Sequence, residues 1–456
     1  MEILDKLLAI VLSLAILGQA IVIRRLVGTW LVPACIFSLF WFAYTFVPLV
    51  ALFFVPIEPL AIAYILLACT LFSLTALGPD WQAAMRVRQN AGSRFRYDTP
   101  FLRHVFHATT ALILLCQLAD LLIQGFSPVD VVLNPLGTAA EYTARRYAED
   151  LEKNIFAQLG LLFAYPAATI GGLLYGARAQ GDTGYRTLLL AVLPSLAMML
   201  IQGAKGTVFL AVFMIWGGVL LTRIERGEFT LVDQGGVKRL LFYCLLAFPF
   251  LLLSFLSRML NSMDGGAEVV QQLVRYFASY TSAHLYAFSD WFSYWTLGSS
   301  VMEYVLEEDA YGFYTFTALF KLLGSSKTVP MGSYDEYFVY AELLQTNIYT
   351  VFRGLVQDFS VGGALCFVTV SGFLLHWSYW RLLVGRSPFF SAAIFVFSIA
   401  YFYTSFFISL LIWNNVYAGF LLLAFFLRLN DESCRRCALA DSPAPGAAPP
   451  AVCSKP

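Results

Sequence analysis

Charged side chains are scarce in this chain of 456 residues: Asp, Glu, Lys and Arg together make up 13% of it, whereas hydrophobic residues make up 59%. With a mean hydropathy of +0.71, this composition excludes a soluble globular protein, in which about 25% of residues are charged. The alternating pattern that marks a transmembrane β-barrel is also missing. We therefore expect an all-α, polytopic integral membrane protein.

Signatures of several other protein classes are absent. The pair of cysteines in "CRRC" at 434–437 has the spacing of a zinc site, but no second pair of ligands accompanies it, so we predict no metal site. There is no phosphate-binding glycine loop, no internal repeat and no signature of nucleic-acid binding. Arg24 and Arg25 follow the first apolar run in place of small residues, so no cleavable signal peptide is expected.

What the chain does contain is a series of long apolar runs. About 20 such residues form a helix that crosses the hydrocarbon core of a bilayer, which is about 30 Å thick. We predict about eleven transmembrane helices on this basis. They lie near residues 5–23, 29–53, 61–78, 104–124, 154–177, 186–202, 206–222, 240–257, 351–378, 388–406 and 409–427.

The basic residues predict how the chain crosses the membrane. With these spans, 19 of the 29 Lys and Arg residues fall on one face. Loops rich in Lys and Arg stay in the cytoplasm, so we expect a periplasmic N-terminus and a cytoplasmic C-terminus. The membrane domain would cover residues 1–428, and the Pro/Ala-rich tail, 429–456, would be disordered in the cytoplasm.

One predicted external segment, residues 258–350, is much longer than most other loops and rich in aromatic residues. A large, partly helical periplasmic loop of this kind can cover a wet cavity above the membrane. Its densest part, "RYFASYTSAHLYAFSDWFSYW", also fits an interfacial helix anchored by an aromatic belt. Both interpretations remain open, because aromatic rings also provide platforms for sugars.

The stretch "TNIYTVFRGLVQDFSVGGAL", residues 346–365, places polar groups at the start of an apolar helix. At about 100° per residue, Asn347, Thr350, Gln357 and Asp358 share a face and Arg353 lies at its edge. Exposing a charge to lipid costs about 2–3 kcal/mol or more, so this stripe should face a cavity. An arginine that extends towards the lipid headgroups is the alternative.

Three further segments carry polar groups on the same predicted side. If residues 275–290 are helical, Arg275, Tyr286 and Asp290 share a face opposite His284, a pattern that fits a phosphate and sugar site or a solvated surface helix. "GAKG" forms a tight turn around Lys205, which could bind a ligand or simply be solvated. Residues 141–154 form a charged segment that fits a surface or re-entrant helix.

The order of four of these motifs resembles a known family. "ARRY" before a span, the "GAKG" hairpin, "RYFASYTSAHLYAFSD" and "TNIYTVFRGLVQDFSVGGAL" are similar to motifs of bacterial O-antigen and exopolysaccharide repeat-unit polymerases of the Wzy type. The resemblance covers roughly residues 100–380. The hairpin often carries arginine in that family, so Lys205 keeps the cation and loses the bidentate geometry.

The resemblance implies a GT-C glycosyltransferase of the bacterial inner membrane, acting in polysaccharide or lipopolysaccharide synthesis. Its partners would be a glycan donor and acceptor, each on undecaprenyl diphosphate, together with membrane lipids and, where one exists, a chain-length regulator protein, but no nucleic acid. The growing chain would be transferred to a new repeat unit at the periplasmic face, releasing undecaprenyl diphosphate. No cofactor and no metal are implied.

Three roles follow for the polar residues, which we expect to line one externally open cavity. Cations would stabilise the departing diphosphate, a general base would accept the proton of the acceptor hydroxyl, and aromatic or polar groups would hold the glycan. The diphosphate candidates are Arg353, Arg275, Arg258, Lys205, Arg145 and Arg146. The candidate bases are Asp358, Asp290 and His284, and the glycan candidates are Asn347, Thr350, Tyr280, Tyr286, Trp291 and Trp295.

Three other functions fit parts of the sequence. An O-antigen ligase, which transfers a finished glycan to lipid A core, would share the spans, the long loop and the arginines. A flippase or other transporter would typically have repeats and polar groups at mid-membrane, whereas charges here gather towards one face. A structural scaffold would not need cations lining a cavity.

Overall fold

The computed structural model describes residues 2–91, 97–148, 150–152, 154–178, 184–202, 205–232, 266–305, 310–327, 334–385 and 388–440. In the first half of the chain the α-helices are α1 (Glu2–Val27), α2 (Pro33–Ala51), α3 (Pro59–Leu74), α4 (Trp81–Asn90), α5 (Pro100–Ile123), α6 (Pro128–Leu133), α7 (Pro135–Tyr147), α8 (Ile155–Ala177), α9 (Tyr185–Gln202) and α10 (Lys205–Glu225). The second half contains α12 (Gly266–Thr281), α13 (Ala283–Leu297), α14 (Phe313–Leu322), α15 (Val351–Val384), α16 (Pro388–Thr404) and α17 (Asn414–Ala440). Short 3-10 turns occupy Thr75–Leu77 and Leu410–Ile412.

Eight helices in the described part of the chain are long and apolar enough to cross a membrane: α1, α2, α3 with its 3-10 extension, α5, α8, α9, α10 and α15. The protein is therefore a mostly helical, polytopic membrane protein, as the sequence predicts. The predicted spans at 388–406 and 409–427 correspond to α16, which is apolar but shorter, and to the start of α17. The span predicted at 240–257 lies outside the described residues.

Local sequence signals set where the helices begin. Proline stands at the first turn of α2, α3 and α5, where its missing N–H costs no hydrogen bond. Side chains of Thr99 and Asn154 accept hydrogen bonds from the first turns of α5 and α8, which caps these two helices. The predicted boundaries at 104 and 154 therefore lie close to the observed ones.

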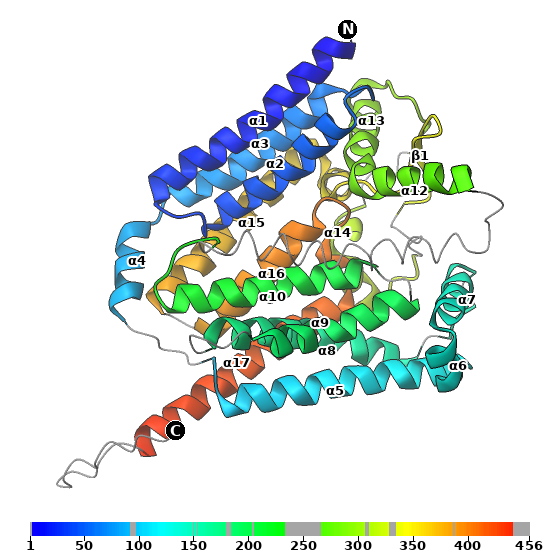
Figure 1. The fold of residues 1–456 in the computed structure, drawn as a ribbon. Coiled ribbons are helices and arrows are strands. Elements are labelled where there is room, and N and C mark those ends of the chain that lie inside the picture. Colours follow the sequence, from blue (N-terminus) through cyan, green and yellow to red (C-terminus); the bar gives the residue numbers. More distant parts are fainter. Residues whose placement is uncertain are drawn as a thin grey trace.

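The membrane helices pack closely where small residues meet. A Cβ on Gly172 of α8 would lie 2.1 Å from the backbone oxygen of Ile215 in α10, and one on Gly218 of α10 would lie 2.5 Å from the backbone oxygen of Thr169. Glycine at both positions lets the two backbones approach, as in other membrane helix pairs. Helices α8, α10 and α5 form one packed group, and α1, α2 and α3 form another (Figure 1).

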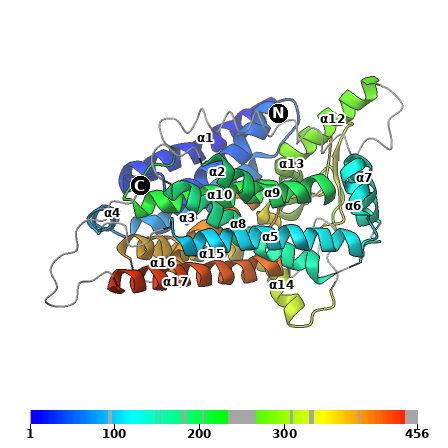
Figure 2. The same cartoon turned by 60° about the horizontal axis from the view of Figure 1, so that its bottom comes forward.

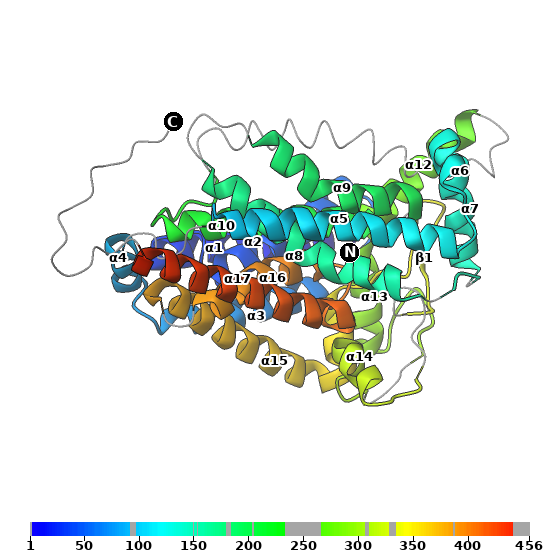
Figure 3. The same ribbon diagram turned by 90° about the horizontal axis from the view of Figure 1, so that it is seen from below.

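Different elements lie at the two ends of the bundle. In all three views α4 lies at one end, and α6, α7 and α12 lie at the other (Figures 1, 2 and 3). At the α4 end, Arg88 and Glu225 form a buried ion pair with 2.7 Å between Nη2 and Oε2. The end that carries α12 also holds α13, α14 and the hairpin of β1 (Phe338–Tyr340) and β2 (Leu344–Thr346), whose antiparallel register pairs Val339 with Gln345.

The predicted loop 258–350 is partly helical in its described portions, since it contains α12, α13 and α14 as well as the hairpin. Residues 429–440, the start of the tail that we predicted to be disordered, are helical, because α17 continues to Ala440. Ion pairs one turn apart support this extension: Arg428 with Glu432, and Arg435 with Asp431. Residues 441–456 lie outside the described part of the chain.

Candidate functional site

The site is centred on the first turns of α15, which differ from the predicted stripe. Asn347 and Thr350 precede the helix, and Thr350 is its N-cap residue. Every residue from Val351 to Asp358 is buried, so these turns have no single polar face directed at a cavity. The prediction of a continuous stripe was wrong because the helix begins only at Val351, and α13 and α14 pack against α15.

A break follows these turns. Ser360 has φ 65° and ψ 173°, a conformation that residues other than glycine rarely adopt and that costs about 1–3 kcal/mol. The break follows the buried segment 351–358 and the partly buried Phe359, and separates them from the long apolar part of the helix, 361–384. Discontinuous helices at membrane depth position polar groups in many transport and binding sites.

Arg353 is the cation at the centre of the site, and only 1% of its side chain is exposed. Its Nη2 lies 2.9 Å from Oε2 of Glu336, a residue that is 23% exposed. Four aromatic rings surround the guanidinium. The distances from Cζ to the ring centroids are 3.8 Å for Tyr334, 4.1 Å for Tyr349, 5.3 Å for Trp291 and 5.6 Å for Tyr304. We call these four rings the aromatic cage.

The cage is neutral, so it does not replace an anion. Burial raises the pKa of the Tyr304 and Tyr334 hydroxyls well above their usual range. Burial also raises the pKa of Tyr349 to about 12, against the opposing effect of the Arg353 charge. Cation–π contact with desolvated rings contributes about 2 kcal/mol, and Glu336 supplies the negative charge that pairs with Arg353.

Several buried polar atoms around this point have no hydrogen-bond partner among the residues that the structure describes. They are Nε and Nη1 of Arg353, Nε1 of Trp291, Oγ1 of Thr350 and Oε1 of Gln357. Buried polar groups are nearly always paired, so unpaired ones point to function or to a ligand. Unused donors and acceptors therefore gather at the mouth of α15.

Asp358, a candidate base, accepts hydrogen bonds from two backbone amides at the start of α14. The N–H of Tyr314 donates to Oδ1 at 3.0 Å, and the N–H of Thr315 donates to Oδ2 at 2.6 Å. A carboxylate at a helix N-terminus satisfies orphan amides and the helix dipole. Both oxygens of Asp358 are thus engaged in holding α14 against α15.

Asp290, another candidate base, lies at the middle of α13 and is only partly buried. Its carboxylate accepts from the N–H of Val301 at 2.7 Å, the N–H of Met302 at 3.2 Å and the hydroxyl of Tyr304 at 2.8 Å. Because Tyr304 belongs to the aromatic cage, Asp290 connects the cage to the outside of the bundle.

His284 and Tyr286, on α13, are buried in the contact with α2. Pro48 has no N–H to donate to the carbonyl of Tyr44, four residues earlier, and Nε2 of His284 lies 3.1 Å from that oxygen. The hydroxyl of Tyr286 donates to the carbonyls of Pro48 and Leu52 at the end of α2. With 1% of each side chain exposed, His284 offers no accessible base and Tyr286 no accessible ring in this conformation.

The expected helix over 275–290 is interrupted. Ser282, whose backbone angles are φ −133° and ψ −26°, separates α12 from α13. Arg275 therefore lies on a different helix from Tyr286 and Asp290, and the single shared face predicted for them is wrong. Nη2 of Arg275 donates to Oε1 of Gln345 in β2 at 2.7 Å.

Arg275 and Arg353 contact two parts of the same short segment, Gln345 and Glu336, on either side of the β1–β2 turn. Their environments are nevertheless different, since Arg353 is enclosed and Arg275 is partly exposed. The sequence predicts one open cavity shared by both arginines. Arg353 is instead enclosed by protein and does not face such a cavity. Among the glycan candidates, Trp291 is fully buried and Trp295 is half-buried. The centroids of their two rings are 5.3 Å apart.

Lys205 begins α10, and its side chain is 8% exposed. Its Nζ lies 5.4 Å from the centroid of the Tyr280 ring, which belongs to α12 and is 36% exposed. Two glycan candidates also approach the cage: Thr350 precedes α15, and Nδ2 of Asn347 donates to the carbonyl of Tyr334 at 3.4 Å. Arg258 lies outside the described residues.

Arg145 and Arg146 lie on α7 and contact a different polar centre. Nη1 of Arg145 donates to the carbonyl of Gln124, and Nη1 of Arg146 donates to that of Gln202. Beside them, the buried carboxylate of Asp120 accepts from side chains of four elements or loops. The donors are Gln124, Tyr142, Asn154 and Gln202. This cluster joins the ends of α5, α7, α8 and α9.

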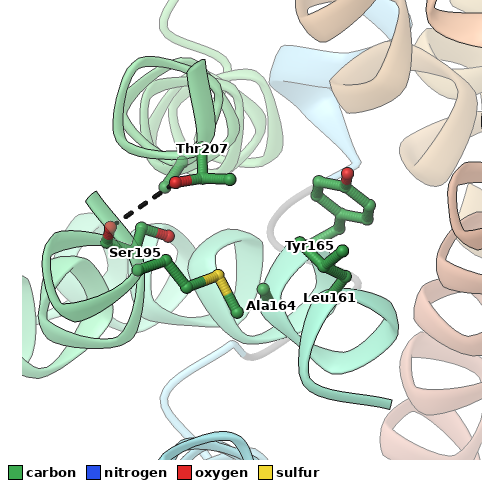
Figure 4. Close-up of a pocket in the computed structure, with 7 residues that line it drawn as sticks. Leu161, Ala164, Tyr165, Ser195 and Thr207 are labelled. Carbon is green, nitrogen blue, oxygen red and sulfur yellow. Dashed lines mark hydrogen bonds between the residues drawn. The ribbon is translucent and has the colours of Figure 1, made fainter. Parts of the chain in front are cut away.

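A small cavity lies between α8, α9 and α10 (Figure 4). Its lining includes Tyr165 and Met198, and Oγ1 of Thr207 donates to the carbonyl of Ser195 at 3.5 Å. With a volume of about 10 Å³ it has room for about one water molecule, so it is too small for a lipid or a sugar.

Four neighbours of Arg353, namely Glu336, Tyr304, Tyr334 and Tyr349, were not predicted as site residues from the sequence. Tyr349 carries a usable signal, because it lies in "TNIYTVFR", four residues before Arg353. No spacing rule connects Glu336 or Tyr334 to α15, since the hairpin brings them there.

Among the described residues, no group of three or more His, Cys, Asp or Glu side chains is arranged to hold a metal ion. No protein-family model, curated protein or solved structure matches this chain.

Proposed function

We propose that this protein is a membrane glycosyltransferase that polymerises oligosaccharide repeat units carried on undecaprenyl diphosphate, at the periplasmic face of the bacterial inner membrane. The observation that carries the proposal is Arg353. It is a buried cation at the mouth of a membrane-length helix, and its Nε and Nη1 have no partner within the described residues. A diphosphate offers several oxygens to such a guanidinium.

The proposed reaction needs a cation and a base. The acceptor hydroxyl oxygen attacks the anomeric carbon of the donor, the bond from that carbon to the diphosphate oxygen breaks, and the hydroxyl proton passes to a carboxylate. Arg353 would stabilise the charge that develops on the departing diphosphate. Asp290 is the preferred base, because it is partly exposed whereas Asp358 and His284 are buried.

The aromatic residues near Arg353 support a role in glycan binding. Trp295, on the same helix as Asp290, and Tyr280, beside Lys205, keep partly exposed rings at the same end of the bundle. In this proposal they hold the sugar units, and Arg275 and Lys205 contribute further positive charge around the diphosphates. The lipid tails of both substrates would lie along the apolar helices.

The test is polymerisation in proteoliposomes supplied with both lipid-linked substrates. Arg353→Ala should lower the rate at least about 100-fold, because it removes a preorganised cation from the transition state. Arg353→Lys should restore part of the rate, since it keeps the charge without the bidentate geometry. Arg103→Ala is the matched control: its exposed side chain pairs with Asp98, outside the site.

Polymer of normal length and yield from inserted Arg353→Ala protein would refute the proposal. The same substrates separate the nearest alternative, an O-antigen ligase. Cells that lack a polymerase accumulate a single capped repeat unit, whereas cells that lack a ligase accumulate long polymer on undecaprenyl diphosphate. A transporter would move the substrate across the liposome without extending it.

A further inference from the structure

We propose that Glu336 acts as a built-in anion that occupies Arg353 in the resting protein, and that an incoming diphosphate displaces it. The diphosphate as ligand rests on the proposed function, whereas the displaceable contact rests on the geometry around Glu336. In this arrangement the segment 334–346 is a strap that closes the site.

The ion pair is well placed to be exchanged. Glu336 reaches Arg353 through one contact, from Nη2 to Oε2 at 2.9 Å, and leaves Nε and Nη1 of the guanidinium without partners among the described residues. An oxyanion that met two N–H groups in parallel would bind this guanidinium better than Glu336 does. The contact with Glu336 therefore engages only one of the three guanidinium nitrogens of Arg353.

The partner of Arg353 is also the more accessible of the two. Glu336 is 23% exposed and Arg353 is 1% exposed, so the carboxylate covers the guanidinium from the outside. The other oxygen of the carboxylate, Oε1, accepts from the N–H of Val305 at 3.3 Å, a long contact that is itself exposed. Few strong bonds thus oppose the departure of this side chain.

The strap is a small structural unit. Its two strands contain three residues each, and such a hairpin depends on packing for its stability, here through the buried side chains of Phe338 and Leu344. Besides Glu336, the strap carries Tyr334, whose ring lies 3.8 Å from Cζ of Arg353. Moving the strap would remove one cage ring and one counter-charge together, and would leave Trp291 and Tyr349 on α13 and before α15.

Exchange is favoured over simple opening by electrostatics. Leaving a buried cation without a partner is strongly unfavourable. An anion that arrives as Glu336 leaves keeps Arg353 neutralised throughout. Glu336 therefore holds the empty site in a stable form and sets a threshold, because only an anion that binds Arg353 better can open the strap.

The experiment measures binding of inorganic pyrophosphate to the full-length protein in detergent by calorimetry. Glu336→Gln keeps the size of the side chain and removes its charge, so it should bind pyrophosphate at least about tenfold more tightly than wild type. Asp335→Asn is the matched control, since it removes the neighbouring, exposed charge and should change the affinity less than twofold. Adding Arg353→Ala to Glu336→Gln should abolish the gain.

Unchanged or weaker pyrophosphate binding by folded Glu336→Gln would overturn the inference, and so would an equal gain from Asp335→Asn. If the glutamine variant does not accumulate, Glu336→Asp serves instead, because its shorter side chain weakens the contact and should also tighten pyrophosphate binding. The polymerisation assay reports separately on the proposed function. A displaceable strap in a protein that makes no polymer would leave this inference standing and refute only the enzymatic proposal.

Discussion

At the scale of single residues, the polar groups of α13 support the fold as well as any chemistry. Pro48 interrupts the hydrogen bonding of α2, and His284 compensates by contacting the freed carbonyl of Tyr44. Nζ of Lys6 donates to the carbonyl of Leu52 and to the hydroxyl of Tyr286, which closes the end of the same helix. Such groups must find partners within the protein, because lipid supplies none.

The His284 contact predicts how stability depends on pH. Burial lowers the pKa of His284 from 6.5 to about 4, so the unfolded chain binds a proton between these values that the folded protein does not. Its contribution therefore favours folding above pH 6.5 and is lost as the pH falls towards 4, by up to about 3 kcal/mol. His284→Gln keeps a donor for Tyr44 and cannot titrate.

Thermal unfolding of both proteins in detergent at several pH values measures this effect. The difference in midpoint between wild type and His284→Gln should shift in favour of the glutamine variant from pH 6.5 to pH 4. A constant difference over that range would show that His284 is not held neutral in the folded protein.

At the scale of elements, apolar run length predicted most of the membrane helices, while the breaks within helices were not predictable. Serine stands at the break between α12 and α13, and again at the break inside α15. Neither Ser282 nor Ser360 has the rigid φ of proline or the freedom of glycine, so sequence gives no signal there. The helical face predicted to continue across Ser282, from Arg275 to Asp290, was therefore wrong.

The candidate site was predictable only in part for a related reason. Arg353 is recognisable because a charge inside an apolar helix start is unusual. Its partners Glu336 and Tyr334 reach it through the folding of a hairpin, which no periodic pattern records. Likewise, the helix over 429–440 depends on side-chain pairs, such as Arg435 with Asp431, that the composition of the tail obscured.

Close packing of α8 against α10 gives a prediction at this scale. Gly172→Ala would place a methyl group 2.1 Å from the carbonyl oxygen of Ile215, which forces the two backbones apart. Overpacking of this kind costs about 1–3 kcal/mol. Gly18→Ala in α1 is the control, because nothing lies within 4 Å of its added Cβ and alanine favours a helix.

The thermal midpoint and the yield of detergent-extracted protein report the outcome. Gly172→Ala should unfold at a lower temperature than wild type, and Gly18→Ala should unfold at the same temperature or slightly higher. Equal midpoints for the two variants would mean that α8 and α10 are not in contact through Gly172.

At the scale of the whole molecule, the polar clusters lie at opposite ends of the bundle. The buried pair of Arg88 and Glu225 lies with α4, whereas Arg353 lies with α13 and α14 at the end that carries α12 (Figure 1). The predicted membrane sidedness assigns the first end to the cytoplasm and the second to the periplasm. The proposed reaction requires this assignment, because its lipid-linked substrates are joined on the periplasmic side.

Cysteine labelling in intact cells tests the sidedness directly. With the native cysteines replaced by serine, Glu141→Cys on α7 and Gln82→Cys on α4 place one exposed thiol at each end. A membrane-impermeant maleimide that crosses the outer membrane should label Glu141→Cys in intact cells and Gln82→Cys only after the inner membrane is opened. The reverse pattern would place Arg353 and its aromatic cage in the cytoplasm. No periplasmic diphosphate could then reach them, and the polymerase proposal would fail whatever the residues themselves can bind.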